Sequence, residues 1–386
     1  MMDFSKIKVL VTDGGARQTM TIIHGLKEMG CYVAVLCSSK MDVCYVSRLP
    51  DERIVHKDAA GSGAGFEDFL ASVVASGKYD VLLPVAEITT NKVTQHEEEY
   101  KKYVKIACAP RRAYIQAFNK QNTFEHAMRI GIPCPYTRRE GQDIEDYLGK
   151  ARFPIIIKPR QGLGSIGFHK FETEAEFREM LNSGKLNVDE YVVQEFVRFE
   201  KRVGTYIFVD QSNNIACSMA QDVLRWFPID AGTAVLTRSV DAPDAIRYSG
   251  ELLKAMNWRG FANVGFMIDQ DTGKPMLLEI NGRISAGVKL SLMCGINIAR
   301  QLIELAYDEP VTVYPPNAKF GLMARHTQAD LGWFLKSPNR FRVKPSWFSW
   351  KNTQDLVFWA NDPLPFFAYT IRKFLGYKNS MSKRKH

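Results

Sequence analysis

The sequence lacks several features that define common classes of protein. Its seven cysteines and seven histidines are scattered, with no CxxC pair and no metal-ligand spacing, which argues against a disulfide framework or a zinc site. No uninterrupted apolar run is long enough to cross a bilayer, and no apolar leader opens the chain. We therefore expect a reduced, cytoplasmic protein of 386 residues with two or three domains.

The excess of positive charge is confined to the C-terminal part of the chain. The formal net charge is +9, and residues 336–386 hold seven Lys, four Arg and only two Asp. These residues account for the whole excess, so the rest of the chain is neutral overall. A nucleic-acid-binding face would carry clustered basic charge on the folded body. We therefore expect no nucleic-acid partner.

The first hundred residues alternate between strand and helix patterns. Apolar strands are predicted at 6–12, 31–37 and 80–85, and helices at 17–29 and 66–76, which indicates a parallel sheet. The turn Gly14-Gly15-Ala16-Arg17 lacks the spaced glycines of a dinucleotide-binding loop. Glu87 follows the strand at 80–85 and is a candidate substrate contact, although a solvated or helix-capping acid is the favoured interpretation.

The stretch from Met276 to Ser285 carries the pattern most typical of a catalytic site. It predicts a buried strand in which Glu279 and Asn281 share one face, about 7 Å apart, while Leu278 and Ile280 share the other. A carboxylate and an amide carbonyl are hard oxygen donors of the kind that Mg²⁺ accepts. Arg283 follows, and its guanidinium suits a phosphoryl group.

A second apolar strand, at 153–159, ends in a lysine and a glycine-rich loop. Lys158 precedes Gly162, Gly164 and Ser165, and such glycines let backbone N–H groups approach phosphate oxygens. The loop has no Gly-Lys-Ser/Thr ending, so it is not a P-loop, and a plain glycine hairpin fits the pattern equally. A helix is predicted over 113–130 with Lys120 in its middle, and a loop containing Arg225 and Thr233 precedes the strand at 235–240.

Taken in order, these stretches resemble the ATP-grasp superfamily, in particular its carbamoyl-phosphate-synthetase-like branch of carboxylate–amine ligases. The resemblance covers about residues 5–310. It rests on Lys120 before Gly131-Ile132-Pro133, on the strand that ends at Lys158 with its glycine loop, and on three later stretches: Gln194-Glu195-Phe196-Val197, Glu200, and Leu278-Glu279-Ile280-Asn281-Gly282-Arg283.

The resemblance implies a fold and a domain organisation. The fold class is α/β, with a parallel pre-grasp domain over 1–112 and a two-lobed α+β ATP-grasp domain over 113–312. Its small lobe spans about 150–197 and its large lobe about 198–312. An aromatic and basic extension follows over 313–386.

The resemblance also implies roles for individual residues. The cofactors would be ATP and Mg²⁺, with Mn²⁺ as a substitute. Lys120 and Lys158 would hold the phosphates, with Gly162, Gly164 and Ser165 as the lid over them. The segment Gln194, Glu195, Phe196 and Val197 would meet adenine through its main chain, and Glu200 the ribose. Glu279 and Asn281 would be metal ligands, Arg283 would steady the transferred phosphoryl group, and Glu87, Arg225 and Thr233 lie in loops that would contact substrate.

The implied reaction joins a small-molecule carboxylate to an amine through an acyl phosphate, releasing ADP and phosphate. Such catalysis is mainly positioning and charge neutralisation. One departure matters: family members commonly carry Glu, Gln or Asp, a further metal ligand, where this chain has Gly265. The alternative is therefore a nucleotide-binding regulatory or scaffold protein of the same fold with impaired catalysis. A homodimer is considered as well.

The segment from Trp333 onward is rich in aromatic and basic residues. It contains four of the six tryptophans and ends in Lys383-Arg384-Lys385 before His386. This composition suits an anionic membrane interface, and it also suits stacking on single-stranded nucleic acid, which the neutral body of the chain disfavours. An extension packed on the core is the other interpretation. Similar ends resemble ATP-grasp proteins of surface-polysaccharide synthesis, and membrane contact would place the protein at the inner face of the membrane.

Overall fold

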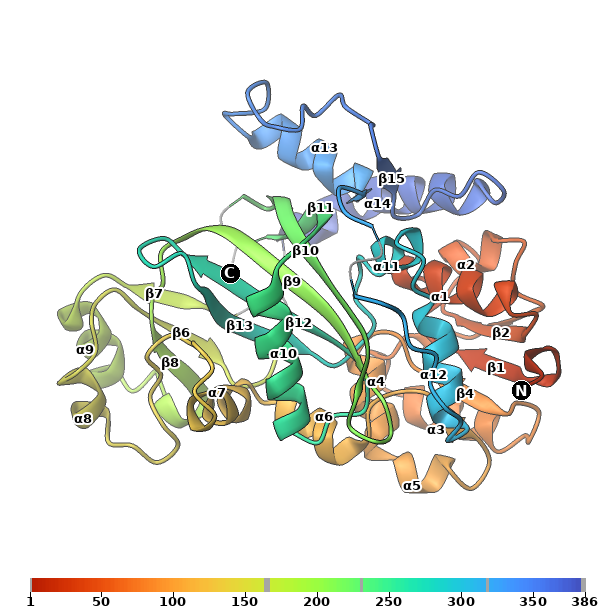
Figure 1. Cartoon of the computed structure of the whole chain (residues 1–386), viewed down its shortest axis with the longest axis horizontal. Helices are drawn as coiled ribbons and strands as arrows, with labels where there is room; N and C mark the ends of the chain where they lie inside the picture. Colours follow the sequence, from red (N-terminus) through yellow and green to blue (C-terminus); the bar gives the residue numbers. More distant parts are fainter. Residues whose placement is uncertain (1, 163–166, 230–231, 317–318, 383–386) are drawn as a thin grey trace.

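The computed structural model of the chain describes residues 2–162, 167–229, 232–316 and 319–382, and side chains up to residue 375. Three sheets lie in a row (Figure 1). The first domain lies at one end, a small three-stranded sheet lies at the other, and a seven-stranded sheet occupies the middle. The C-terminal segment crosses above the large sheet toward the first domain.

The first domain is a parallel five-stranded sheet in the order β3-β2-β1-β4-β5. This confirms the expected βαβ opening, since parallel strands need crossover connections. The strands are β1 Lys8–Val11, β2 Tyr32–Cys37, β3 Glu52–Val55, β4 Val81–Leu83 and β5 Lys105–Ile106; the helices are α1 Arg17–Glu28, α2 Val43–Val46, α3 Phe66–Val74, α4 Glu87–Gln95 and α5 Glu97–Tyr100, with 3-10 turns at Phe4–Lys6 and Lys57–Ala59.

Two helices connect this domain to the small sheet, and the sequence predicted only one. The expected helix over 113–130 divides into α6 (Arg111–Phe118) and α7 (Lys120–Arg129). The division occurs at Asn119, whose extended backbone and side-chain carbonyl, accepting from Gln121 N at 3.0 Å, begin a new helix. Lys120 therefore stands at the start of α7 and not in the middle of a helix.

The small antiparallel sheet has the order β7-β6-β8 and carries its own helices on one side. Its core includes Tyr147, Ile155, Ile157, Phe177 and Val193. The elements are α8 Ile144–Leu148, β6 Ile155–Pro159, β7 His169–Phe171, α9 Glu174–Asn182, a 3-10 turn at Val188–Glu190, and β8 Tyr191–Glu195.

The large sheet has the order β13-β12-β9-β10-β11-β14-β15. One of its faces is apolar and packs against α10, with Val203, Ile207, Val264, Phe266 and Ile280 in the shared core. The elements are β9 Phe199–Val209, β10 Ile215–Phe227, β11 Thr233–Val240, α10 Pro243–Ala255, β12 Gly260–Asp269, β13 Pro275–Asn281, α11 Lys289–Met293, α12 Ile298–Ala306, β14 Met323–Arg325 and β15 Thr353–Asp355.

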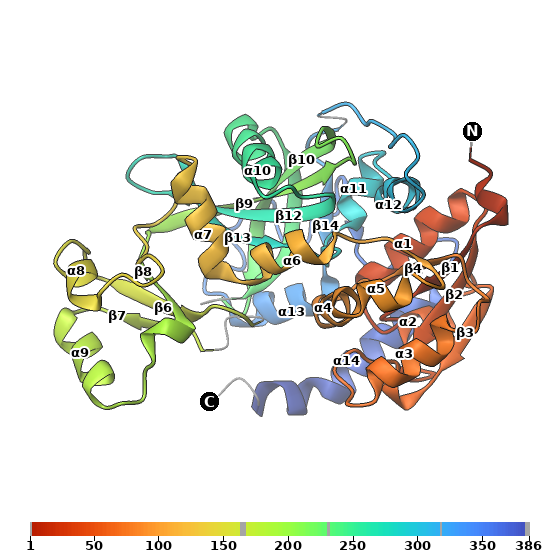
Figure 2. The ribbon, with the colours of Figure 1, turned by 90° about the horizontal axis from the view of Figure 1, so that it is seen from below.

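The segment after residue 312 is built into the folded body. It supplies β14 and β15 to the large sheet, and its helices are α13 (Thr327–Lys336) and α14 (Leu364–Ser382). The helix α14 runs beneath the first domain (Figure 2) and packs on α2. Trp359 stacks on His24 with ring centres 3.5 Å apart, and Ser47 donates to Asp362 at 2.5 Å. No helix in the part of the chain that the structure describes combines the length and apolar character needed to cross a membrane.

Candidate active site

The second face of the large sheet is polar where strands β10, β9, β12 and β13 meet. Cross-strand pairing places Gln221, Gly204, Gly265 and Glu279 in one row across these four strands. Directly paired residues share a face of a sheet, and so do residues two positions apart on one strand. Arg202, Tyr206, Asn263 and Asn281 therefore lie on the same face as this row.

Between Gln221 and Glu279 the row contains Gly204 and Gly265, which have no side chains, so the backbone of the sheet is exposed on this face. A Cβ at Gly265 would lie 3.5 Å from Cγ of Glu279, which is ordinary contact. A Cβ at Gly204 would lie 3.3 Å from the amide nitrogen of Gln221 and 3.4 Å from that of Asn263. Neighbouring side chains thus approach over the glycines, and a ligand can lie close to the strands there.

Glu279, Asn281 and Arg283 form a connected group at the end of β13. The Asn281 amide donates to a Glu279 carboxylate oxygen at 2.9 Å, and Arg283 donates to the Asn281 carbonyl at 3.4 Å. Glu87, the first residue of α4, lies on the other side of Arg283, with 3.7 Å between its carboxylate and Nε. Burial raises the pKa of Glu87, Arg283 lowers it, and the nearby charge of Glu279 raises it further. The structure therefore brings Glu87 into this group.

Lys158 reaches from the small sheet to β13. Its ammonium lies 3.4 Å from the carbonyl of Leu278 and 4.5 Å from the ring centre of Phe124. Burial lowers the pKa of Lys158 to about 7, against the opposing influence of the Glu279 carboxylate. A buried lysine without a direct carboxylate partner is costly unless an anionic ligand joins it. Lys120 lies nearby and donates to the carbonyl of Gly162 at 3.0 Å.

The oxygen atoms of the side chains on this face suit a hard divalent cation, provided that phosphate also binds the cation. Glu279 and Asn281 provide carboxylate and amide oxygens, which suit Mg²⁺ or Mn²⁺. In the ranges that the structure describes, no three His, Cys, Asp or Glu side chains gather into a group that could hold a metal. With Gly265 in the row, phosphate oxygens and water must complete the coordination of a cation.

The glycine loop and the strand after it were predicted to surround the nucleotide. Gly164 and Ser165 lie outside the described residues, whereas Gly162 has a φ of +133° and receives the Lys120 bond. The amides of Glu195 and Phe196 already donate to the carbonyls of Tyr136 and Pro154, both at 2.9 Å. The nucleotide contacts of Glu195, Phe196 and Val197 stay a prediction.

The structure contradicts the predicted nucleotide contact of Gln194. Its side chain is 1% exposed and donates to the hydroxyl of Thr137 at 2.6 Å. Its backbone pairs with Ile156 inside the small sheet. Since both the side chain and the main chain are used within the fold, Gln194 holds the strand in place and is not available to a nucleotide.

The structure also contradicts the predicted substrate contact of Arg225. The sequence placed it in a loop open to substrate, but it lies on β10 and is 3% exposed. Its guanidinium makes two bonds of 2.7 Å to Asp330, and Arg325 contacts the same carboxylate at 2.8 Å. This buried group joins the large sheet to α13, so Arg225 has a structural role.

Two other predicted residues lie near the polar face. Glu200 is exposed near the start of β9, at an irregularity in the pairing of β9 with β12, two positions before Arg202. Thr233 is exposed at the start of β11 and follows Gly232, whose carbonyl accepts from Arg202 at 3.2 Å. Both positions are compatible with ligand contact, and their roles stay predictions.

Arg202 is a site residue that the sequence did not reveal. It lies over the ring of Trp226, 4.3 Å from its centre, and burial lowers its pKa while Glu279 raises it. Gln221 was missed as well, and its amide oxygen is buried without a hydrogen-bond partner among the described residues. The alternation Glu200, Arg202, Gly204, Tyr206 was a usable signal for β9, but the pairing of β9 with β13 through β12 is not visible in the sequence.

Parts of the chain are similar in sequence to known proteins. A family model described as "ATP-grasp in the biosynthetic pathway with Ter operon" matches residues 231–329. The carbamoyl phosphate synthase large chain of Xylella fastidiosa is 28% identical over 253 residues, which cover 61% of this chain and 23% of the synthase. The D-alanine–D-alanine ligase of Lactiplantibacillus plantarum is 28% identical over 176 residues, covering 40% and 47% of the two chains.

Solved structures share the fold over most of the chain. A biotin carboxylase from Campylobacter jejuni has a TM-score of 0.67 at 15% identity, covering 82% of this chain and 73% of that one. An ADP complex of N5-carboxyaminoimidazole synthetase from Staphylococcus aureus has a TM-score of 0.63 at 17% identity, covering 81% and 80%. The chain spans only about a quarter of the synthase large chain that it resembles. The chain is thus similar in sequence to ATP-grasp proteins over part of its length, and it shares its fold with the solved structures over most of it.

Proposed function

We propose that this chain is an ATP- and Mg²⁺-dependent ligase that joins a carboxylate to an amine. The observation that carries the proposal is the polar face of the large sheet. Glu279, Asn281 and Arg283 lie there beside the half-buried Lys158, and Gly265 exposes the backbone next to them. Buried cations next to hard oxygen ligands are what a polyphosphate with a bound divalent cation requires.

Each residue contributes by charge and position. Lys158 gains an anionic partner when a phosphate binds, which offsets the cost of its burial. Lys120 holds the start of the glycine loop near the same phosphates. A Mg²⁺ ion held by Glu279 and Asn281 would neutralise charge on the phosphate oxygens. Arg283, supported by Glu87, lies where it can contact the group being transferred.

The reaction has two steps. A substrate carboxylate oxygen attacks the γ-phosphorus of ATP, the bond to the bridging oxygen breaks, and ADP leaves. The amine nitrogen then attacks the acyl carbon of the acyl phosphate, inorganic phosphate leaves, and the nitrogen loses a proton. Arg283, Arg202 and Lys158 stabilise negative charge during transfer, and this electrostatic contribution is usually the largest in such catalysis.

The alternative is a nucleotide-binding regulatory or scaffold protein with impaired catalysis. Gly265 favours this alternative because it provides no oxygen ligand next to Glu279. The two functions differ in one measurable outcome, which is release of ADP in the presence of acceptors. We propose to measure ADP release in Mg²⁺ with a panel of small carboxylic acids and amines, taken in pairs.

Turnover that needs both a carboxylate and an amine supports the ligase. ATP binding that depends on Mg²⁺, without turnover for any pair, supports the scaffold protein. An absence of ATP binding rejects both functions. The Lys185→Met variant is a suitable control for general effects of substitution, because Lys185 is exposed on the small lobe away from the row.

We further propose that α14 contacts an anionic membrane. Five large apolar side chains along this helix are 53–70% exposed: Leu364, Phe367, Ile371, Phe374 and Leu375. Their spacing of three and four residues places them on one stripe. Phe366 lies outside this stripe and packs against the core that the first domain shares with the large sheet. Basic residues on the same segment complement anionic headgroups, each contributing about 1 kcal/mol.

Vesicle co-sedimentation tests this contact. Removing α14 would also uncover the core contact of Tyr369, which is 5% exposed, so point variants are the sharper choice. The double variant Ile371→Gln, Phe374→Gln should bind anionic vesicles less than the natural chain, and salt should release the natural chain. Leu335→Gln, at an equally exposed apolar position on α13, is the matched control. Equal sedimentation of all three chains removes the proposal.

We propose a cytoplasmic location with attachment at the inner face of the membrane through α14. Together with the composition of the tail, this favours an acceptor from cell-envelope or surface-polysaccharide synthesis. A solved relative of this fold is named as a domain dimer, and we propose a homodimer for this chain too. Light scattering at several concentrations measures its molar mass directly.

A further inference from the structure

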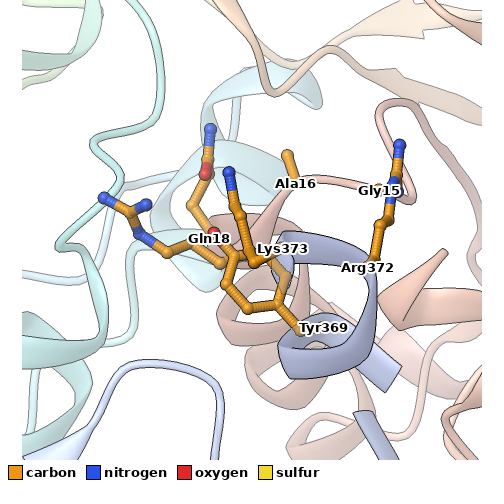
Figure 3. A pocket seen from close by; sticks show the side chains of 7 residues that line it. Gly15, Ala16, Gln18, Tyr369, Arg372 and Lys373 are labelled. Carbon is orange, nitrogen blue, oxygen red and sulfur yellow. The ribbon is translucent and has the colours of Figure 1, made fainter. Parts of the chain in front are cut away.

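A cavity of about 370 Å³ lies between the first domain and the C-terminal helix (Figure 3). One wall is the loop from Gly15 to Gln18 at the start of α1, and the other wall is formed by Tyr369, Arg372 and Lys373 of α14. Three of the lining side chains are cationic. Figure 3 shows Gln18 at the start of α1 and Lys373 on α14 among the side chains that line the cavity.

Positive charge in this cavity exceeds what the fold needs. Arg372 pairs with Asp42, but no carboxylate among the described residues pairs with Arg17 or Lys373. Burial holds the pKa of His326 well below the usual range, and the charges of Arg17 and Lys373 lower it further. The two cations thus converge on one region, where like charges repel unless an anion is bound.

The start of α1 adds to this positive potential. The helix begins at Arg17 after Ala16, which makes no side-chain cap, and its first turn contains no acidic residue. The free N–H groups and the dipole of a twelve-residue helix favour an anion at this end. A basic residue at this position opposes the dipole, so its placement is unfavourable without a bound anion.

The loop is held in a fixed conformation. Asp13 has a φ of +60°, and its carboxylate accepts from Ala86 N at 2.9 Å and from the hydroxyl of Thr89 at 2.7 Å. A Cβ at Gly15 would lie 2.7 Å from a guanidinium nitrogen of Arg372 and 2.9 Å from a carboxylate oxygen of Asp42, so a larger residue there would displace this ion pair. The cavity wall is therefore formed before any ligand arrives.

The cavity adjoins the candidate active site. Arg17 donates from Nε to the carbonyl of Ala286 at 3.1 Å, and Ala286 lies three residues after Arg283. Tyr369 connects the same wall to His326, with 3.2 Å between its hydroxyl and Nε2. A molecule with an anionic group in the cavity can therefore extend toward Arg283 along the loop that follows β13.

We propose that this cavity binds a phosphoryl group of the carboxylate substrate, with Arg17, Arg372 and Lys373 as its cationic partners. The proposal rests on the proposed ligase function and names a class of substrate: an acid that also carries a phosphate monoester. A tetrahedral dianion suits the combination of helix N–H groups, guanidinium forks and an ammonium.

Calorimetric titration with inorganic phosphate tests the cavity on the full chain. The chain is first saturated with Mg²⁺ and a non-hydrolysable ATP analogue, so that the nucleotide site is filled, and ionic strength is held constant. We expect one phosphate site whose affinity falls at least tenfold in Lys373→Met and in Arg17→Met. Lys102→Met, at an exposed position on the first domain, should leave the affinity unchanged. Malonate in place of phosphate tests a compact dicarboxylate, which should bind more weakly.

The outcomes separate this proposal from the ligase proposal. Phosphate binding that is absent, or unchanged in both cavity variants, overturns the cavity assignment while ATP binding stands. Stronger binding of malonate than of phosphate overturns the phosphoryl assignment. If the ATP analogue itself does not bind, the ligase proposal fails, and titration of phosphate into Lys120→Met, Lys158→Met chains still tests the cavity. Lys373 is exposed, so Lys373→Met keeps the test valid if Arg17→Met does not fold.

Discussion

Replacing Lys158 with methionine should stabilise the protein in the absence of ATP. Burial lowers the pKa of this lysine from 10.5 to about 7. A tenfold change in proton affinity between the folded and unfolded chains corresponds to about 1.4 kcal/mol, so holding the ammonium in the fold costs on the order of 5 kcal/mol. Methionine keeps an unbranched stem without the charge. Arg202 and Asn281 remain beside Glu279, so the carboxylate is not left alone.

The pH dependence of this effect has a definite sign. Between about pH 7 and pH 10.5 the unfolded chain holds a proton at Lys158 that the folded chain has released, so folding gains stability as pH rises. The cost of the lysine is complete below about pH 7 and disappears toward pH 10.5. Lys158→Met should therefore exceed the natural chain in stability most strongly at about pH 6 and least at about pH 9.5.

Urea denaturation at these two pH values, followed by tryptophan fluorescence, measures the difference. Ligand at a hundred times its Kd stabilises the natural chain by about 2.7 kcal/mol. Saturating Mg²⁺ and ATP should therefore narrow the difference at pH 6 and reverse the order at pH 9.5, where only about 1.4 kcal/mol of the cost remains. The exposed Lys185→Met provides the control. A Lys158→Met chain that is less stable than the natural chain, by an amount independent of pH, would refute the reasoning.

Two further substitutions test the row and the buried ion pair. Gly265→Gln places an amide oxygen beside Glu279 and should tighten Mn²⁺ binding in the presence of an ATP analogue by about 1 kcal/mol, roughly fivefold; calorimetry should show no gain for Gly265→Ala. Arg225→Met leaves Asp330 with Arg325 alone and should lower the free energy of unfolding by about 3 kcal/mol, while the ATP affinity of the folded chain stays the same. If Arg225→Met lost ATP affinity but kept its free energy of unfolding, Arg225 would be a ligand-binding residue and not a structural one.

Local sequence patterns predicted the strands and helices that carry the site better than they predicted which residues meet there. The strand at 276–280 follows from side-chain alternation, which is a property of one segment, and the structure confirms it as β13. Glu279 and Asn281 share a face as predicted, but a bulge places Leu277, and not Leu278, in the core with Ile280. Lys158 at the end of an apolar strand is confirmed in the same way, as part of β6. The helix boundary at Asn119 was also readable, since asparagine is a common N-cap.

Residues that meet through the register of distant strands were not predictable. Arg202 belongs to the site because β9 pairs with β12, and β12 with β13, and these strands lie far apart in the sequence. Arg225 was misread because its partner Asp330 lies 105 residues away. The strands β14 and β15 are three residues each, too short for a periodic signal, so the contribution of the C-terminal segment to the large sheet was not foreseen.

Calorimetric titration of ATP into the natural chain and into Glu279→Gln, each with Mg²⁺ and with EDTA, tests the central claim most directly. The account predicts that the natural chain binds ATP more tightly in Mg²⁺, because Glu279 holds the cation on the phosphates. Glu279→Gln should lose this gain, keep its affinity in EDTA and keep its melting temperature. In turnover, loss of such stabilisation costs about 3–4 kcal/mol, or roughly 10²–10³ in rate. A Glu279→Gln chain with the full Mg²⁺-dependent gain would contradict the account.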